Sequence, residues 1–225
     1  MRLSWIIAAG VAVAAYSPPA RRWYLTWGAT PEEATGPLAG DELLLEPDLQ
    51  STRAVTVDAP PAAVWPWLVQ MGSGRGGAYT YDWIENLLGL GMHSADEILP
   101  RFQHLAVGDV LPLGPDGPGM RVEICEPEQT LSFRSEDGDW VWTFRLHPEG
   151  AYTRLVSRNR IAAPTASWPA RIVTRLVMEP GSLIMERRML LGIKERAERT
   201  VPPSEQTAVR RETSGLSRRD GSGDG

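Results

Sequence analysis

Cysteine, lysine and histidine are scarce in this sequence of 225 residues, which holds one cysteine (Cys125), one lysine (Lys194) and three histidines. A single cysteine excludes an internal disulfide and leaves the cellular compartment open. His104 and His147 are isolated, and His93 has no second histidine near it, so neither a metal site nor a cofactor is predicted. A net charge of −5 excludes the broad basic surface that nucleic acid binding requires, so no nucleic acid partner is expected.

Long apolar runs are also scarce. The longest, Leu3–Ala15, lies between Arg2 and the pair Arg21-Arg22 and is shorter than the ~20 residues that usually span a bilayer. Residues 1–22 are predicted to be a membrane anchor or uncleaved signal. The arginine pair that follows the run favours an orientation in which the rest of the chain lies on the cytoplasmic side. A cleaved signal peptide, which would make the protein secreted, is the alternative, and a buried globular helix is the third interpretation.

The rest of the chain divides by composition into three parts. Residues 23–50 are rich in proline, glycine and acidic residues and are predicted to be a connector. Residues 51–199 carry the periodic patterns of one folded domain. Residues 200–225 contain proline, serine, glycine and charge without aromatic residues, which is typical of a disordered tail. The oligomeric state is left open.

The patterns of the folded domain predict both strands and helices. A strand is expected at 51–57, followed by a helix capped by Asp58 that continues to Met71 and by a second helix at 81–88. Five further strands are predicted at 108–113, 120–126, 130–134, 139–146 and 153–162. The short turns between them require antiparallel hairpins. Two helices follow at 168–178 and 182–199, separated at Glu179-Pro180-Gly181.

A glycine-rich segment, residues 70–83, is the most distinctive local feature. Gly72, Gly74 and Gly77 spell G-x-G-x-x-G, which in a βαβ unit would bind a dinucleotide. The prolines shortly before it, at 60, 61 and 66, argue against a preceding central strand, and hairpins rather than a second βα unit follow. The glycines are therefore predicted to supply positive-φ turns.

Alternation assigns side chains to the two faces of the sheet. Inward positions are predicted for Met120, Val122, Ile124, Leu131, Phe133, Trp140, Trp142, Phe144, Leu146, Leu155, Ser157, Asn159 and Ile161. Outward positions are predicted for Arg154, Arg158, Arg160 and Cys125. The aromatic inward face has two interpretations, a hydrophobic ligand cavity or a solid core. Ser157 and Asn159 are either polar points within such a cavity or hydrogen-bond partners of a neighbouring helix.

Several segments resemble one known superfamily. They are Val57–Gly72 (VDAPPAAVWPWLVQMG), Gly74–Asn86 (GRGGAYTYDWIEN), His93–Ile98 (HSADEI), Trp27–Thr30 (WGAT) and Arg187–Leu190 (RRML). Together these resemble START-like, or SRPBCC, proteins, in an uncharacterised bacterial branch. The resemblance implies an α+β helix-grip fold: a curved antiparallel sheet around a long C-terminal helix, with two small helices after the first strand. The superfamily includes lipid carriers, hormone receptors, polyketide cyclases and oxygenase domains, so the resemblance leaves the activity open.

The candidate site residues combine aromatic surface with polar groups. The candidate ligand-binding residues are Arg75, Tyr79, Tyr81, Trp140, Trp142, Phe144, Ser157 and Asn159. Arginine binds carboxylate or phosphate groups, and tyrosine hydroxyls donate to carbonyls. The candidates for acid–base catalysis are His93, Asp96 and Tyr79. For Arg75 and Asp82 a purely structural pairing is the alternative.

These patterns favour binding or transport of a small hydrophobic, lipid-like or polyketide-like molecule in an internal cavity. An enzyme of the cyclase or dehydratase type, acting on an aromatic polyketide-like substrate, is one alternative. A protein-interaction module with a filled cavity is the other.

Overall fold

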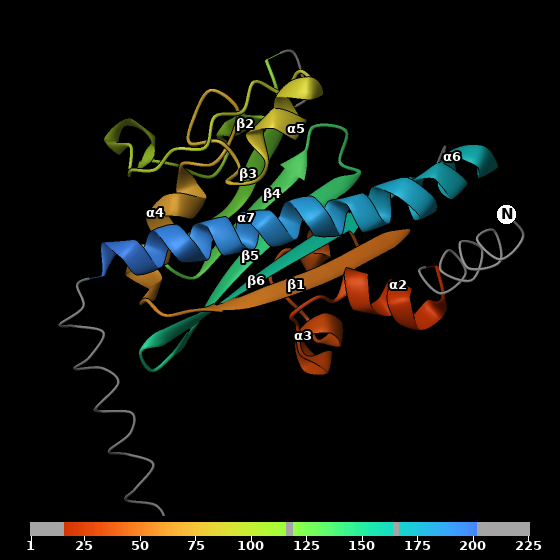
Figure 1. Cartoon of the computed structure of the whole chain (residues 1–225), viewed down its shortest axis with the longest axis horizontal. Coiled ribbons are helices and arrows are strands. Elements are labelled where there is room, and N and C mark those ends of the chain that lie inside the picture. Colours follow the sequence, from red (N-terminus) through yellow and green to blue (C-terminus); the bar gives the residue numbers. More distant parts are fainter. Residues whose placement is uncertain (1–15, 116–118, 164–166, 202–225) are drawn as a thin grey trace, which may run out of the picture.

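Six antiparallel strands form one sheet in the computed structural model, which describes residues 16–115, 119–163 and 167–201 (Figure 1). The strands are β1 (Leu49–Val57), β2 (Val110–Pro112), β3 (Gly119–Glu126), β4 (Thr130–Ser135), β5 (Trp140–Glu149) and β6 (Tyr152–Ile161). Their order is β1-β6-β5-β4-β3-β2, so the first strand lies beside the last. Every pair is antiparallel, which agrees with the predicted hairpins and leaves no βαβ unit for a dinucleotide among these strands.

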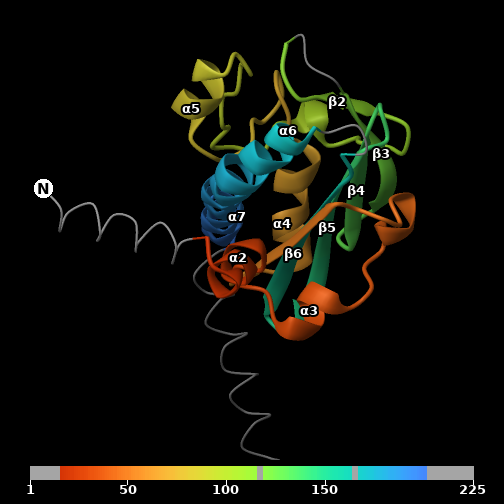
Figure 2. The ribbon, with the colours of Figure 1, turned by 90° about the vertical axis from the view of Figure 1, so that its right-hand side faces the viewer.

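Short helices surround the sheet, and one long helix crosses it. They are α2 (Pro18–Leu25), α3 (Pro31–Thr35), η1 (Asp41–Leu43), α4 (Pro61–Val69), α5 (Asp82–Leu87), η2 (Pro100–Phe102), α6 (Trp168–Val173), η3 (Thr174–Met178) and α7 (Glu179–Thr200). The helices α4 and α5 are the two small helices expected after the first strand. The predicted α+β helix-grip fold is confirmed by this arrangement of sheet and long helix (Figure 2).

The C-terminal helix is continuous from Trp168 to Thr200, through α6, η3 and α7. The predicted break at Glu179-Pro180-Gly181 is therefore wrong. Pro180 lies in the first turn of α7, and the five residues before α7 form a π-helical turn. A proline at this point removes one amide donor from the helix, and the wider π turn accommodates the loss without ending the helix.

The predicted cap of the first small helix is also wrong. Helix α4 begins at Pro61 after Pro60, and no side chain caps its first turn. The backbone amide of Asp58 instead donates to the Glu198 carboxylate at 2.7 Å. The two prolines start the helix without Asp58, because proline fixes a helical φ and needs no amide partner in the first turn.

A β-bulge changes the faces of β3. The register of β3 on β4 shifts between Val122 and Ile124, so that Ile124 pairs with Ser132 and Cys125 with Leu131. Cys125 consequently packs against the core, and its thiol donates to the carbonyl of Leu105 at 3.4 Å. The predictions of an inward Ile124 and an outward Cys125 are wrong, because one extra residue reverses the alternation that follows.

The core fills the space between the inner face of the sheet, α4 and α7. Its fully buried members include Val57, Trp67, Leu68, Val122, Leu131, Phe144, Leu155, Leu190 and Ile193. Burial of each such side chain contributes about 1.5–3 kcal/mol relative to exposure. This packing fixes α7 across the strands that carry the candidate site.

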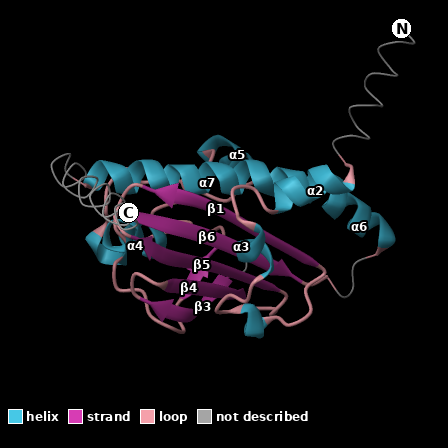
Figure 3. Cartoon of the chain, turned by 90° about the horizontal axis from the view of Figure 1, so that it is seen from below, coloured by secondary structure: helices cyan, strands magenta, loops and turns pink. Residues whose placement is uncertain are grey.

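The connector covers the outer face of the sheet. Arg158 points outward as predicted, yet only 2% of it is exposed. Its guanidinium donates to the carbonyls of Glu33 and Gly36 at 2.6 and 3.0 Å and pairs with Asp41 at 2.6 Å. Figure 3 shows α3, which belongs to this connector, in front of the strands. The outer arginines therefore hold the connector in place.

Residues 1–15, which carry most of the predicted membrane segment, lie outside the described residues, as do residues 202–225 of the predicted tail. The described part of the chain contains no helix with the length and apolar character needed to cross a membrane. Helix α2 follows the apolar run and packs Tyr24 and Leu25 against Leu183 of α7. The membrane anchor and its alternatives remain predictions.

Candidate functional site

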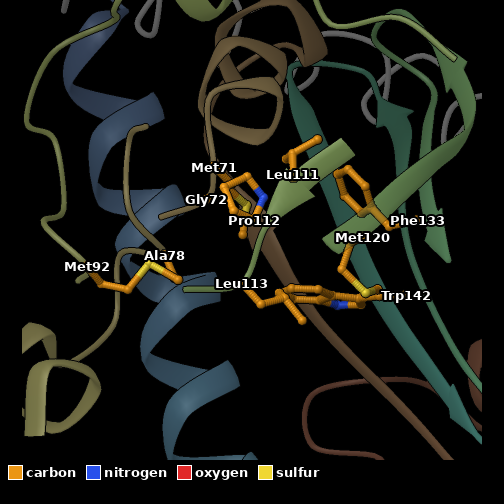
Figure 4. Close-up of a pocket in the computed structure, with 10 residues that line it drawn as sticks. All are labelled: Met71, Gly72, Ala78, Met92, Leu111, Pro112, Leu113, Met120, Phe133 and Trp142. Atoms are coloured by element: carbon orange, nitrogen blue, oxygen red, sulfur yellow. The ribbon is translucent and has the colours of Figure 1, made fainter. Parts of the chain in front are cut away.

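A small apolar pocket lies between the sheet and the glycine-rich segment (Figure 4). Its lining residues are Met71, Gly72, Ala78, Met92, Leu111, Pro112, Leu113, Met120, Phe133 and Trp142. The cavity volume is about 50 Å³, which is room for a few water molecules and is well below the ~300–1,000 Å³ of drug-sized ligand pockets. In the conformation described here, this pocket is too small for a lipid.

One tryptophan of β5, Trp142, lies at the wall of this pocket, and a second, Trp140, lies next to it. The rings of Trp140 and Trp142 stack, with centroids 5.9 Å apart, and Phe144 follows at 4.8 Å from Trp142. Trp142 lines the pocket, whereas Phe144 is completely buried. The indole of Trp142 donates to the Ser157 hydroxyl at 3.0 Å, and that of Trp140 donates to the Asn159 side-chain carbonyl at 2.8 Å. The aromatic wall is thus bonded to polar groups of β6.

Those polar groups belong to one cluster, the Glu186 cluster, which consists of Arg53, Ser157, Asn159, Ser182 and Glu186. Arg53, Ser157 and Glu186 are buried, Asn159 is half-buried and Ser182 is exposed. One carboxylate oxygen of Glu186 accepts from Ser157 at 2.6 Å and from Asn159 at 3.1 Å. The other oxygen pairs with the guanidinium of Arg53, which is completely buried. Arg53 also donates to Ser182 at 2.9 Å and to the Tyr24 carbonyl at 3.0 Å. Ser157 and Asn159 are therefore hydrogen-bonded to α7.

Sequence reasoning missed Arg53 and Glu186, although both left a signal. Arg53 alternates with Val55 and Val57 in β1, which places it on the inner face. Glu186 lies three residues before Met189 and seven before Ile193, which places it on the buried stripe of α7. Two opposite charges at inward positions of elements that pack together indicate an ion pair.

Arg75 is held by the segment that carries it. Its guanidinium donates to the carbonyls of Met71 and Val69 at 3.0 and 2.8 Å and to that of Phe102 at 3.3 Å. It also lies 4.5 Å from the Phe102 ring centroid. Burial lowers the pKa of Arg75. The side chain therefore satisfies carbonyls at the end of α4, and it is not among the residues that line the pocket.

The three glycines have the predicted backbone conformation. Gly72, Gly74 and Gly77 have φ values of 121°, 70° and 73°, and Gly72 and Gly77 pair with each other as a small antiparallel bridge. A Cβ on Gly77 would lie 2.6 Å from the carbonyl oxygen of His93. The glycines thus allow a tight turn and a close contact with the segment after α5.

Tyr79 is buried beneath this turn. It is 1% exposed, and its hydroxyl donates to the carbonyl of Trp67 at 2.9 Å. Its ring meets that of Trp67 edge to face at 5.8 Å, and the guanidinium of Arg196 lies 4.9 Å from its centroid. Burial raises the pKa of Tyr79 well above its usual value. Its hydroxyl stays protonated at neutral pH and bonds within the chain.

This burial predicts a stability change at alkaline pH. Because the folded state holds the Tyr79 proton more tightly than the unfolded state, stability is full below the ordinary pKa of 10.0 and falls as the pH rises above it. Burial also raises the pKa of Tyr24, which acts in the same direction. We expect a shallower fall for Tyr79→Phe than for the wild type, measured as urea midpoints between pH 8 and 11. Identical slopes would contradict the prediction.

The candidate acid–base residues are not joined to one another by any hydrogen bond or ion pair within the described ranges. His93 is exposed. Asp96 pairs with Arg196 at 2.9 Å, and Arg196 in turn covers Tyr79. Asp82 accepts from the hydroxyl and the amide of Ser94, at 2.5 and 2.8 Å, rather than pairing with Arg75.

The remaining candidate, Tyr81, is half-buried and precedes α5. Among the described residues no cluster of three or more histidine, cysteine, aspartate or glutamate side chains is arranged to hold a metal ion. Five of the eight predicted ligand-binding residues, Trp140, Trp142, Phe144, Ser157 and Asn159, lie on the neighbouring strands β5 and β6. Arg75, Tyr79 and Tyr81 lie in the glycine-rich segment instead.

No protein-family model matches the sequence, and no curated protein sequence matches it. Among solved structures, the chain is similar to protein MLL2253 from Mesorhizobium loti (21% identity over 68% of this chain and 100% of that chain; TM-score 0.40). It is also similar to the Aha1 dimer from Colwellia psychrerythraea (14% identity over 60% of this chain and 92% of that chain; TM-score 0.34). A third similar structure is CalU16 from Micromonospora echinospora (16% identity over 66% of this chain and 83% of that chain; TM-score 0.31). These likenesses concern the fold. The helix-grip assignment itself follows from the sheet order and the long helix of this chain.

Proposed function

We propose that the protein binds a small hydrophobic molecule with a polar end between the inner face of its sheet and the glycine-rich segment. The observation that carries this proposal is the position of Trp142, whose ring lines the apolar pocket while its indole N–H reaches Ser157 of the Glu186 cluster. Apolar walls with a few convergent polar groups are typical of small-molecule sites. The apolar part of the ligand contacts Met120 and Phe133, and its polar end meets the groups beside the tryptophan pair.

Entry of such a ligand requires the pocket to enlarge. One wall is formed by the glycine-rich segment and Met92, and the opposite wall by β2 and the inner face of the sheet. Few backbone hydrogen bonds join the glycine-rich segment to its surroundings: Ser73 donates to Pro112 at 3.2 Å, and Ala95 donates to Gly76 at 3.0 Å. Opening the pocket therefore requires these two bonds to break and the segment to move relative to the anchored side chains of Arg75 and Tyr79.

A tryptophan substitution tests the proposal. We expect Trp142→Ala to weaken binding of a fatty acid or aromatic polyketide at least about tenfold, which corresponds to about 1.4 kcal/mol. Trp142→Phe keeps the aromatic wall but loses the N–H, so it separates the apolar from the polar contribution. Binding is measured by calorimetry on the full chain, and native mass spectrometry identifies any co-purified molecule.

Trp23→Ala is the matched control, because Trp23 is exposed on α2 and lies outside the pocket. If the wild type binds no member of a panel of fatty acids, sterols and aromatic polyketides, the proposal is wrong. The cavity of about 50 Å³ then favours the second candidate, an interaction module with a filled core. If the protein converts a bound molecule into a product, the alternative of a cyclase or dehydratase enzyme is favoured instead.

We further propose that the apolar run in residues 1–22 attaches the protein to a membrane. The proposal is supported by the flanking arginines and the absence of charge between Arg2 and Arg21. Fractionation of the full chain tests it, and a mature protein that begins after the run would identify the cleaved signal peptide instead.

A further inference from the structure

The first third of the C-terminal helix, residues 168–178, extends beyond the packed body. Every residue in it is exposed, whereas Glu179, the first residue of α7, is only 4% exposed. The exposed large apolar residues are Trp168, Ile172, Val173, Leu176, Val177 and Met178, of which Trp168 is 75% exposed. We call this set the apolar helix face. Soluble proteins rarely expose so many adjacent apolar side chains without a partner.

The apolar helix face has an amphipathic pattern. Trp168, Ile172, Val173 and Leu176 recur at i, i+4, i+5 and i+8, which places them on one side of a helix. Arg171 and Arg175 lie at i+3 and i+7 from Trp168 and therefore border this apolar stripe. Tryptophan and arginine beside an apolar stripe are typical of helices that lie in a membrane interface.

Tyr16, which precedes α2, contacts this same helix. Pro180 has no amide hydrogen, so the carbonyl of Leu176, four residues earlier, lacks its usual helical partner. The hydroxyl of Tyr16 donates to that carbonyl at 2.7 Å. Tyr16 comes directly after the apolar run Leu3–Ala15. The described structure therefore begins, at Tyr16, beside the apolar helix face, and Figure 1 shows α2 and α6 at the same end of the molecule.

The charges at this end are mostly positive, although the whole chain has a net charge of −5. Arg21 of α2 pairs with Glu179 at 2.8 Å, and Arg171 pairs with Asp48 at 3.3 Å. Arg22 and Arg175 add positive charge beyond these two pairs. A surface with apolar and basic side chains is complementary to a bilayer that contains anionic lipid.

We propose that the apolar helix face is a second membrane contact, which lies against an anionic lipid bilayer beside the N-terminal run. A run of apolar residues shorter than ~20 gives marginal attachment by itself, and an amphipathic helix at the same end supplies the second attachment. The inference rests on the proposed membrane attachment by residues 1–22 and on surface residues outside the pocket, so it holds whether or not the proposed ligand binds.

A single fluorescent label tests this contact on the full chain. Cys125→Ser with Val177→Cys gives one cysteine, which is labelled with the environment-sensitive fluorophore NBD. On phosphatidylcholine vesicles with added phosphatidylglycerol, we expect the emission to rise several-fold and shift to shorter wavelength, and to be quenched by lipids brominated in their chains. Neutral vesicles should give a smaller change. The control label is placed by Glu149→Cys, at the exposed last residue of β5, and should not respond. Figure 1 shows the β5–β6 turn, which follows this residue, at the opposite end of the molecule from α6.

Three results would overturn the proposal. In the first, the full chain binds no vesicles. In the second, it binds while the label at 177 keeps its aqueous emission, which would leave attachment to the N-terminal run alone. In the third, the label is already shielded from water in the absence of lipid. If this shielding increases with protein concentration, a second copy covers the apolar helix face. If it is independent of protein concentration, the chain's own apolar run covers it. Adding Ile172→Ser and Val173→Ser should weaken the response at 177 without changing the urea midpoint, because both residues are exposed.

Discussion

Replacing Glu186 with alanine is expected to lower the free energy of unfolding by about 3–5 kcal/mol, because the completely buried guanidinium of Arg53 then loses its carboxylate. The substitution also leaves Ser157 and Asn159 without the oxygen to which both donate. Urea denaturation of the full chain measures the loss as a shift of the midpoint at constant slope.

The double variant Arg53→Met with Glu186→Leu is the matched control. It removes both charges together, so it leaves no buried ion unpaired and should cost clearly less than Glu186→Ala alone. Glu195→Ala, on the exposed side of α7, should change stability by less than about 0.5 kcal/mol. If Glu186→Ala behaves like Glu195→Ala, the Glu186 cluster does not hold α7 to the sheet.

Replacing Tyr79 with alanine is expected to cost about 3–5 kcal/mol, as for other large aromatic side chains removed from a core. Tyr79 fills the space between Trp67 of α4 and Arg196 of α7, and the substitution leaves a cavity there. Tyr79→Phe keeps the ring and loses only the bond to the Trp67 carbonyl, so it should cost about 0.5–1.5 kcal/mol. Thermal or urea unfolding measures both.

Tyr81→Ala provides the comparison, since Tyr81 is a nearby tyrosine that is only half-buried. We expect its loss to be smaller than that of Tyr79→Ala. A Tyr79→Ala variant that keeps its stability but loses ligand binding would contradict the structural role and return Tyr79 to the ligand-binding residues.

The strands were predictable because alternation and turn residues are local signals. β4 and β5, for example, begin within one residue of their expected starts. The bulge in β3 was not predictable, because its position depends on how β3 pairs with β4 rather than on β3 alone. The continuous helix was missed for a similar reason: Pro180 is tolerated because Tyr16, 164 residues earlier in the chain, satisfies the carbonyl that the proline leaves free.

The candidate site was predictable in part. Alternation placed Trp140, Trp142, Ser157 and Asn159 on the inner face, where the structure has them bonded to one another and to α7. Local sequence could not show that Arg75 donates to carbonyls of α4 and η2, because those bonds depend on how the glycine turn folds back. Nor could it show the size of the pocket, which depends on packing between distant segments.

The connector on the outer face has a consequence for the order in which the chain can fold during synthesis. Arg158 of β6 bonds to Thr52 and to the Glu33 carbonyl, which lie 106 and 125 residues earlier. Residues 26–57 therefore leave the ribosome long before the strand that holds them exists. Until β6 is made, β1 has no neighbouring strand and the connector has no surface to pack on, so this protein acquires its first and last strands together.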